Sequence, residues 1–239
     1  MPFRDVSLLK QGKEMKSAKQ RIGEIIAVLY KAYPKSRTVL RFESPHQILV
    51  ATILSAQCTD ERVNQITPSL FKKHPTPHDF ASADPKVLEM EIKSTGFFRN
   101  KTKSIIGASK KIVKDFDGAV PDNMEDLLTL PGVARKTANI VLSSAFQKAE
   151  GIAVDTHVKR LSQRLGLSKE NVPDKIEQDL IAIVPKKDWI DFNYMLVLHG
   201  RRVCPSRKPR CPECQLRHLC PSASEFYPEN ELNIPKSSR

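Results

Sequence analysis

The chain has 239 residues, enough for one large domain or two domains of ordinary size. Its hydrophobic fraction of 40% and charged fraction of 28% are those of a folded globular protein, which excludes a fibrous or disulfide-rich scaffold. The formal net charge of +12 predicts a polyanionic partner, most simply a nucleic acid. A basic protein without such a partner is the alternative that charge alone leaves open.

The beginning of the chain has no long apolar core, and no window approaches about 18 uninterrupted apolar residues. We therefore expect neither a secretory signal nor a membrane span, and we expect an intracellular protein. In a reducing compartment the five cysteines are not expected to form structural disulfides. The simplest expectation for the oligomeric state is a monomer.

Hydrophobic spacing and cap residues predict an all-α fold of about ten helices, with no paired strands. Residues 1–17 are polar and basic and are interpreted as a loose arm. Residues 74–83 are predicted to be a proline-bearing loop, and a polar tail with Pro228 and Pro235 ends the chain. The predicted helices begin at Ala18, after Ser44, at Asp60, at Asp84-Pro85, at Asn100, at Asp122, after Gly132, at Asp155, at Pro173 and at Pro185. Ser44, Asp60 and Asp155 are the predicted N-caps of their helices.

The segment Leu130–Leu142 (LPGVARKTANIVL) combines a Pro131-Gly132 turn with the start of a helix. The free N–H groups of the first helical turn form an anion site that suits a phosphate. Lys136 lies in that turn, where the positive end of the helix dipole favours the neutral amine, so Lys136 is a candidate nucleophile. An ordinary turn with a solvated lysine is the alternative.

Four of the cysteines have the spacing C-x6-C-x2-C-x5-C, which predicts a metal centre, either zinc or an iron–sulfur cluster, on Cys204, Cys211, Cys214 and Cys220. His199 is an alternative ligand, although a helix-end residue is the simpler interpretation. Arg207, Lys208 and Arg210 lie between the first two cysteines, where a rigid metal centre would present them to phosphates; solvated loop charges are the alternative. Cys58 is expected to be a core thiol within an apolar helix.

Together these motifs resemble the endonuclease III family, the bifunctional DNA glycosylases and abasic-site lyases of the helix-hairpin-helix class. The resemblance extends from about residue 20 to Cys220. It is carried by LSAQCTDERVN (54–64), GFFRNK (96–101), LPGVARKTAN (130–139), VDTH (154–157) and the cysteine spacing.

The resemblance implies two helical domains that flank a DNA-binding cleft. A six-helix barrel with the helix-hairpin-helix would span 38–148. An iron–sulfur cluster domain would combine 18–37 with 149–239 and hold a [4Fe-4S] cluster on the four cysteines, in a structural or DNA-positioning role. The implied partner is double-stranded DNA with damaged bases or abasic sites, and the implied location is the cytoplasm or nucleoid if the source is bacterial or archaeal.

The resemblance also implies the chemistry. The Lys136 amine would attack the sugar carbon C1′ and displace a damaged base, with oxidised pyrimidines as the family's expected substrates. The resulting imine would allow β-elimination of the 3′ phosphate. Asp155 would stabilise positive charge on the sugar and assist proton transfer, and it would also serve as a helix N-cap. Asp60 would tune Lys136, and His157 would contact the DNA backbone.

Further residues match the family's DNA contacts. Gln57 would fill the space left by an extruded nucleotide, and Phe97 would be a wedge in the opposite strand, with a core anchor as its alternative. The amides of Gly132 and Ala134 would grip a phosphate. The family usually has glycine in place of Ala134, and a positive φ there would cost alanine about 1–2 kcal/mol. The segment 93–114 holds seven basic residues and no acidic one, and would follow the DNA backbone.

Two other functions fit parts of this pattern. One is a monofunctional mismatch glycosylase with the same cluster, although such relatives generally lack a lysine at the position of Lys136. The other is a non-catalytic DNA-binding module, against which the joint presence of Lys136 and Asp155 argues.

Overall fold

The computed structural model describes residues 15–34 and 37–227. Every regular element within these ranges is helical and none is a strand, which confirms the all-α prediction. Most of the predicted arm, at 1–14, and the predicted tail with Pro228 and Pro235 lie outside the described residues.

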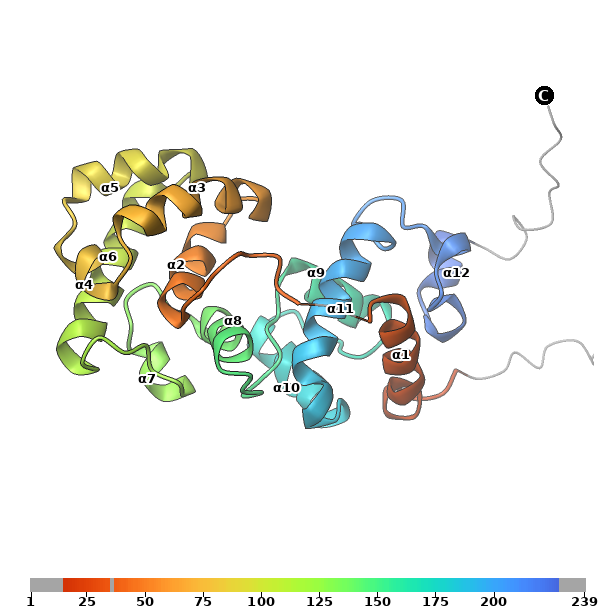
Figure 1. Cartoon of the computed structure of the whole chain (residues 1–239). Coiled ribbons are helices and arrows are strands. Elements are labelled where there is room, and N and C mark those ends of the chain that lie inside the picture. The colour runs from red at the N-terminus through yellow and green to blue at the C-terminus, as the bar shows by residue number, and fades with distance from the viewer. Residues whose placement is uncertain (1–14, 35–36, 228–239) are drawn as a thin grey trace, which may run out of the picture.

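The described residues form twelve α-helices and four short 3₁₀ helices, arranged in two lobes (Figure 1). The first lobe contains α2 (Pro45–Ser55), α3 (Asp60–Lys73), α4 (Pro77–Ser82), α5 (Pro85–Ile92), η1 (Lys93–Thr95), α6 (Phe98–Asp115), α7 (Met124–Leu128) and α8 (Arg135–Ala145). The second contains α1 (Ala18–Ala32), α9 (Thr156–Arg164), α10 (Pro173–Ile183), η2 (Lys186–Asp188), α11 (Trp189–Arg202), η3 (Cys211–Glu213), η4 (Arg217–Leu219) and α12 (Ala223–Phe226).

Each lobe has its own hydrophobic core. The first core gathers apolar side chains from Leu40 to Leu142, with Phe80 at 0% exposure. The second joins α1 to the C-terminal part of the chain, around Ile25 and Phe192. The separation of the two cores agrees with the two predicted domains, whose boundaries stay a prediction.

Several helix starts follow the predicted caps. The hydroxyl of Ser44 and the carboxylate of Asp84 accept N–H groups of α2 and α5, and proline occupies the first turn of each helix. The predicted cap of α3 is wrong by one residue. Thr59 accepts the N–H of Arg62, and Asp60 is the first helical residue. Threonine and aspartate are both good N-caps, so adjacent candidates cannot be separated by residue type.

Two further predictions are corrected. The supposed loop at 74–83 contains α4, which begins with a capping box between Thr76 and Asp79 and has proline in its first turn. Cys58 does not lie within a helix, because α2 ends at Ser55 and Cys58 lies in the connection to α3, half-buried at the edge of the first core.

The two lobes meet around the buried carboxylate of Glu177 on α10, which is 4% exposed. Its Oε2 accepts Nε of Arg135 at 2.6 Å, and its Oε1 accepts Nδ2 of Asn139 at 2.9 Å and the backbone N–H of Ile152 at 3.1 Å. Arg135 and Asn139 belong to α8, so Glu177 ties α8 to the second lobe. A buried carboxylate needs such donors, because desolvation otherwise penalises its charge.

Gly151 allows this approach, because a Cβ atom there would lie 1.9 Å from Oε1 of Glu177 and 2.9 Å from Nδ2 of Asn139. We expect Gly151→Ala to lower the free energy of unfolding by about 1–3 kcal/mol, through overpacking at a buried polar junction. Denaturant unfolding followed by circular dichroism measures this change.

The control is Gly23→Ala on α1, where an added Cβ meets nothing within 4 Å. Alanine in an open helical position should instead raise the free energy of unfolding by about 0.5–1 kcal/mol. Equal effects of the two substitutions would contradict the close approach at Gly151.

Candidate functional site

A cavity of about 400 Å³ opens between the two lobes and is lined by residues from both. Its wall includes the connection from α2 to α3, one side of α8, the segment before α9, and one face of α11. Five candidate catalytic or DNA-binding side chains line this one cavity, together with Cys58: Gln57, Asp60, Lys136, Asp155 and His157.

Lys136 and Asp155 approach the cavity from different lobes. Lys136 is an exposed residue in the first turn of α8. Asp155 is half-buried and is the N-cap of α9, where its Oδ1 accepts the backbone N–H groups of His157 and Val158, each at 2.8 Å. The cap prediction is therefore confirmed. Both bonds use Oδ1, so Oδ2 has no hydrogen-bond donor within the described ranges.

Asp60 and His157 have defined partners at this cavity. The carboxylate of Asp60 forms an ion pair with Arg201 of α11, with 2.7 Å between Oδ2 and Nη2. Nδ1 of His157 lies 3.1 Å from Nη2 of Arg160. The guanidinium donates in this contact when Nδ1 carries no proton, and the backbone of Gly200 also bonds to the His157 ring. Burial lowers the pKa of His157, which favours the neutral ring, although Asp155 opposes this shift.

Sequence reasoning did not find the contribution of α11. Asn193, Val197 and Arg201 line the cavity together with Tyr194 and Leu198. The hydroxyl of Tyr194 lies 2.8 Å from Oγ of Ser144, at the end of α8, so it also links the lobes. The four-residue spacing along α11 was the available signal, because such residues share one helical face. It was hidden by the apolar residues between them.

The hairpin before α8 resolves the question raised by Ala134. Ala134 has φ −96° and ψ 169°, which is extended backbone, so alanine is unstrained there. Gly132 has φ +77°, and an added Cβ would lie 2.4 Å from Cβ of Ser104 on α6. The position that needs glycine is therefore Gly132. No side chain caps the start of α8, so its first N–H groups face outward without an intrahelical partner.

Gln57 and Phe97 stand on two exposed turns with left-handed backbone. Their φ values are +52° and +46°, a conformation that is uncommon for residues other than glycine. Phe97 is 61% exposed, so its interpretation as a core anchor is wrong. Phe97 lies outside the large cavity, beside Phe98, Arg99 and Asn100. Strained turns of this kind concentrate at functional sites.

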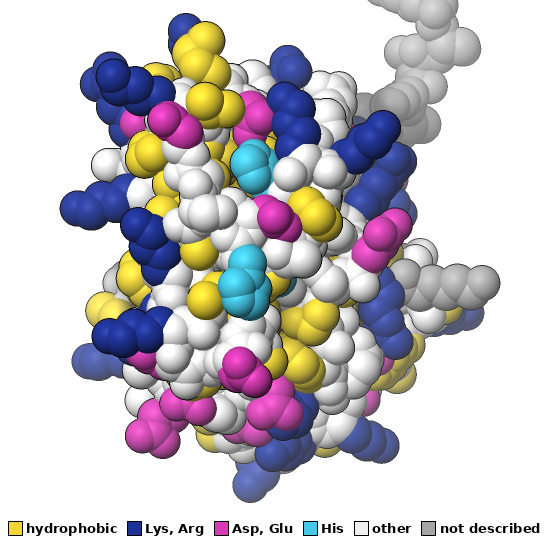
Figure 2. Space-filling model, turned by 60° about the vertical axis from the view of Figure 1, so that its left-hand side comes forward, with side chains coloured by type: hydrophobic (Ala, Val, Ile, Leu, Met, Phe, Trp, Pro, Cys, Tyr) yellow, Lys and Arg dark blue, Asp and Glu magenta, His cyan; other side chains and the backbone are white. Residues whose placement is uncertain are grey.

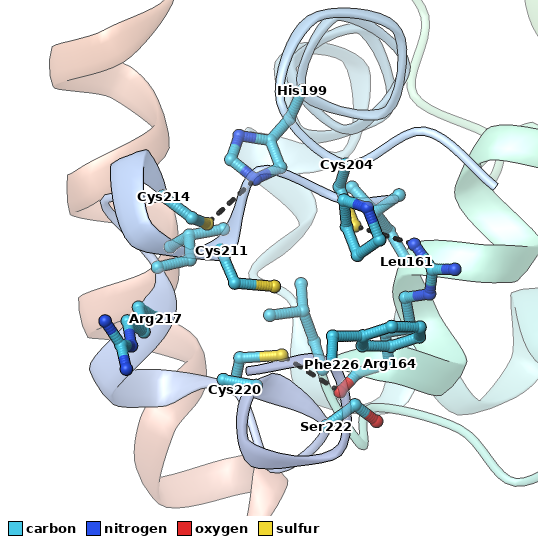
Figure 3. A pocket seen from close by; sticks show the side chains of 14 residues that line it. Leu161, Arg164, His199, Cys204, Cys211, Cys214, Arg217, Cys220, Ser222 and Phe226 are labelled. Atoms are coloured by element: carbon cyan, nitrogen blue, oxygen red, sulfur yellow. Dashed lines mark hydrogen bonds between the residues drawn. The ribbon is translucent and has the colours of Figure 1, made fainter. Parts of the chain in front are cut away.

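The four predicted ligands line one small cavity in the second lobe (Figure 3). Cys204, Cys211, Cys214 and Cys220 surround it, and Figure 3 shows the sulfur atoms of Cys211 and Cys220 pointing into the space between them. Burial raises the pKa of the Cys211 and Cys214 thiols and raises that of Cys220 to about 11. Within 15–34 and 37–227, no group of three or more His, Cys, Asp or Glu side chains is arranged to hold a single metal ion.

His199 lies in the last turn of α11, as the helix-end interpretation predicted, and is 4% exposed. Its Nδ1 lies 3.1 Å from the hydroxyl of Tyr33, and its Nε2 lies 3.4 Å from Sγ of Cys214. Burial lowers the pKa of His199 to about 4, so the ring is neutral. Its place is therefore beside the cysteine cavity, with one nitrogen directed at a thiol.

Arg164 of α9 forms hydrogen bonds to the start of the basic loop between Cys204 and Cys211. The Arg164 guanidinium donates to Sγ of Cys204 at 3.1 Å and to the backbone oxygens of Pro205 and Ser206, each at 2.8 Å. The side chains of this loop remain outside, because Arg207, Lys208 and Arg210 are all exposed. The loop is thus tethered through its backbone while its cations face outward.

Charged side chains are unevenly spread over the face shown in Figure 2. Lys and Arg side chains lie along both edges of this face, whereas Asp and Glu side chains gather most densely near its lower end. Of the seven basic residues in 93–114, only Lys101 is buried, with 5% of its surface exposed.

Among the described residues, no helix has the length and apolar character needed to cross a membrane.

Comparison with known proteins identifies the class. Residues 50–186 match the HhH-GPD superfamily of base excision DNA repair proteins. Endonuclease III of Synechocystis sp. is 58% identical over 211 residues, which cover 88% of this chain and 96% of the relative. Endonuclease III of Bacillus subtilis is 44% identical over 190 residues, covering 79% and 86%.

A solved structure titled as a trapped covalent intermediate of endonuclease III with DNA has a TM-score of 0.83 at 39% identity, covering 87% of this chain and 97% of that chain. The chain therefore belongs to the endonuclease III family, within the HhH-GPD superfamily. Membership confirms the predicted family and the predicted class of enzyme, a base excision repair glycosylase with abasic-site lyase activity.

The geometry of the hairpin yields a paired prediction. Gly132→Ala should lower the free energy of unfolding by about 1–2 kcal/mol from the positive φ alone, with a further loss from the contact with Ser104. It should also weaken binding to a duplex with an abasic-site analogue, because the hairpin must shift. Chemical denaturation and a fluorescence-anisotropy titration measure the two effects.

Ala134→Gly is the matched substitution in the same hairpin. Because Ala134 is already extended, restoring glycine should change stability by less than about 1 kcal/mol and leave DNA affinity unaltered. A clear gain in affinity would show that alanine distorts the hairpin.

Proposed function

We propose that this chain removes damaged bases from duplex DNA through a covalent intermediate on Lys136 and then nicks the abasic site by β-elimination. The observation that carries the proposal is the shared cavity, in which Lys136 and Asp155 face one space from two lobes. Oxidised pyrimidines are the proposed substrate class, and the proposed location is inside the cell, with its DNA. The relative trapped in a covalent complex with DNA supports an amine mechanism.

Lys136 is the proposed nucleophile. Its neutral amine attacks C1′ and forms a C–N bond, while the base leaves with the electrons of the glycosidic bond and takes up a proton. Ring opening then gives an iminium, which makes the 2′ proton acidic. Loss of that proton expels the 3′ phosphate. An alcohol or water could not support the elimination, because only an amine yields this electron-withdrawing group.

Asp155 is the proposed electrostatic and proton-transfer partner. Its Oδ1 is held by two backbone N–H groups, which fix the carboxylate, and its Oδ2 remains for the sugar. A carboxylate oriented before the reaction stabilises the positive charge that develops on the sugar without reorganising. Asp60 supports the site through Arg201, and His157 is proposed to contact the DNA backbone with its ring.

The surrounding turns supply the DNA contacts that this chemistry requires. A base within a stacked duplex must be extruded before C1′ is accessible. We assign Gln57 to the vacated space and Phe97 to the opposite strand, in keeping with the exposure of both. The uncapped start of α8, with the amides around Gly132 and Ala134, is assigned to a phosphate.

We also propose that the four cysteines hold a [4Fe-4S] cluster, as the family resemblance implies. The donor set fits, because four thiols line one cavity and a cationic centre stabilises cysteine ligands as thiolates. The arginine at Cys204 suits the net negative charge of such a cluster. When bound, the cluster would cross-link η3 and η4 to the end of α11 and so stiffen the loop that carries Arg207, Lys208 and Arg210.

Reduction with borohydride tests the covalent step. With a duplex that carries an abasic site, the wild-type chain should form a stable covalent complex that migrates slowly on a denaturing gel. Lys136→Ala should abolish this complex while retaining affinity for an abasic-site analogue. The control is Lys86→Ala, an exposed lysine on α5 outside the cavity, which should trap as the wild type does.

A Lys136→Ala variant that still traps would assign the nucleophile to another amine. A wild-type chain that releases bases but neither traps nor cleaves would favour a monofunctional glycosylase. Binding without base release would favour the non-catalytic module.

Metal analysis tests the cluster. The purified protein should be yellow-brown and contain iron and acid-labile sulfide in equal amounts. Cys220→Ser should lose both the colour and much of the thermal stability, whereas Cys58→Ser should retain them, because Cys58 lines the large cavity between the lobes and not the cysteine cavity. A colourless protein with stoichiometric zinc would overturn this assignment.

A further inference from the structure

Lys101 stands apart from the other basic residues of 93–114, because it is buried at 5% exposure. Its ammonium donates to the backbone oxygen of Leu54 at 2.7 Å and to that of Thr95 at 2.8 Å. Burial lowers its pKa, against the opposing effect of the nearby Cys58 thiol. This cation is thus desolvated at a cost and is held by backbone carbonyls.

Both carbonyl groups lie at the C-terminal end of a helix. Leu54 lies in the last turn of α2, and Thr95 is the last residue of η1. The carbonyl groups at a helix C-terminus lack intrahelical partners and form the negative end of the helix dipole. A cation that bonds both ends therefore offsets part of its desolvation. In doing so it joins two segments that are far apart in the sequence.

Each of the two carbonyls lies just before an exposed turn. Gln57 is three residues beyond Leu54, and Phe97 is two residues beyond Thr95. Both Gln57 and Phe97 are exposed and have left-handed backbone, with φ of +52° and +46°. One ammonium is therefore bonded to the backbone at the entrance to both turns.

We propose that Lys101 is a positioning residue that fixes the Gln57 turn relative to the Phe97 turn, so that both side chains enter the duplex together. The inference rests on the proposed DNA contacts of Gln57 and Phe97. Filling a gap in one strand and wedging the other are parts of one distortion of the duplex, so the two turns must keep a set separation. If this separation is fixed before DNA binds, binding does not carry the entropy cost of ordering each turn separately.

The test compares two DNA substrates with Lys101→Met, which keeps the long apolar stem but removes the donors. An abasic site in duplex requires both turns, whereas an abasic site in a single strand requires neither. The ratio of strand-cleavage rates, duplex over single strand, should fall by about tenfold or more in Lys101→Met, with single-strand cleavage retained. The exposed Lys86→Met on α5, outside the basic segment 93–114, is the matched control.

A second measurement reports the distortion directly. A 2-aminopurine opposite an abasic-site analogue should brighten when wild-type protein saturates the duplex, and it should brighten equally with Lys86→Met. With Lys101→Met the increase should be lost at saturation, so a change in affinity cannot explain it. If Lys101→Met does not fold, Lys101→Gln, which keeps a shorter donor, is measured in the same way.

The outcomes are separable. An unchanged ratio in Lys101→Met, while Gln57→Ala and Phe97→Ala lower it, overturns the inference alone. An equal loss on both substrates, with a lower unfolding midpoint, reduces Lys101 to a structural residue and also overturns it. If Gln57→Ala and Phe97→Ala leave the ratio unchanged, the proposed DNA contacts fail, and the inference fails with them.

Discussion

The buried carboxylate of Glu177 is the contact on which the geometry of the cavity depends. Its donors Arg135 and Asn139 flank Lys136 on α8, and its third donor, the N–H of Ile152, begins the segment that leads to Asp155. A buried charge is tolerated only where its donors are in place, so this junction has little freedom to slip. The positions of the proposed nucleophile and of its carboxylate partner are therefore set together, by a side chain whose hydrogen bonds go to their neighbours.

Helix α6 supports the parts of the first lobe that are proposed to contact DNA. Lys101 holds the turns of Gln57 and Phe97, Ser104 packs against Gly132, and Gly107 packs against Pro131. These contacts recur at three-residue intervals along one helix, so neighbouring positions on its surface support different turns. A single rigid helix thereby sets the relative positions of the two strained turns and the hairpin. Precision of this kind is more easily obtained from a helix than from loops alone.

Local chemistry explains where sequence-based prediction succeeded and where it failed. Ser44, Asp84 and Asp155 begin their helices as predicted, because a side-chain oxygen beside free N–H groups is a short-range signal. The cap of α3 was misplaced where Thr59 and Asp60 compete, and α4 was missed because Pro75 and Pro77 suggested a loop. The strain expected at Ala134 is absent, because its φ is −96°. Neighbouring residues impose this backbone angle, and residue type alone does not reveal it.

The sequence by itself determined the all-α class, the family, and the candidate residues, because helix periodicity, caps and motif spacing are encoded locally. It named Lys136, Asp155 and the four cysteines, but it carried no measure of how distant segments meet. Only the tertiary structure decided that Arg201 pairs with Asp60, that α11 lines the cavity, and that Lys101 is buried between two turns. Such facts depend on packing between segments far apart in the chain, where burial and partner choice are properties of the assembled core.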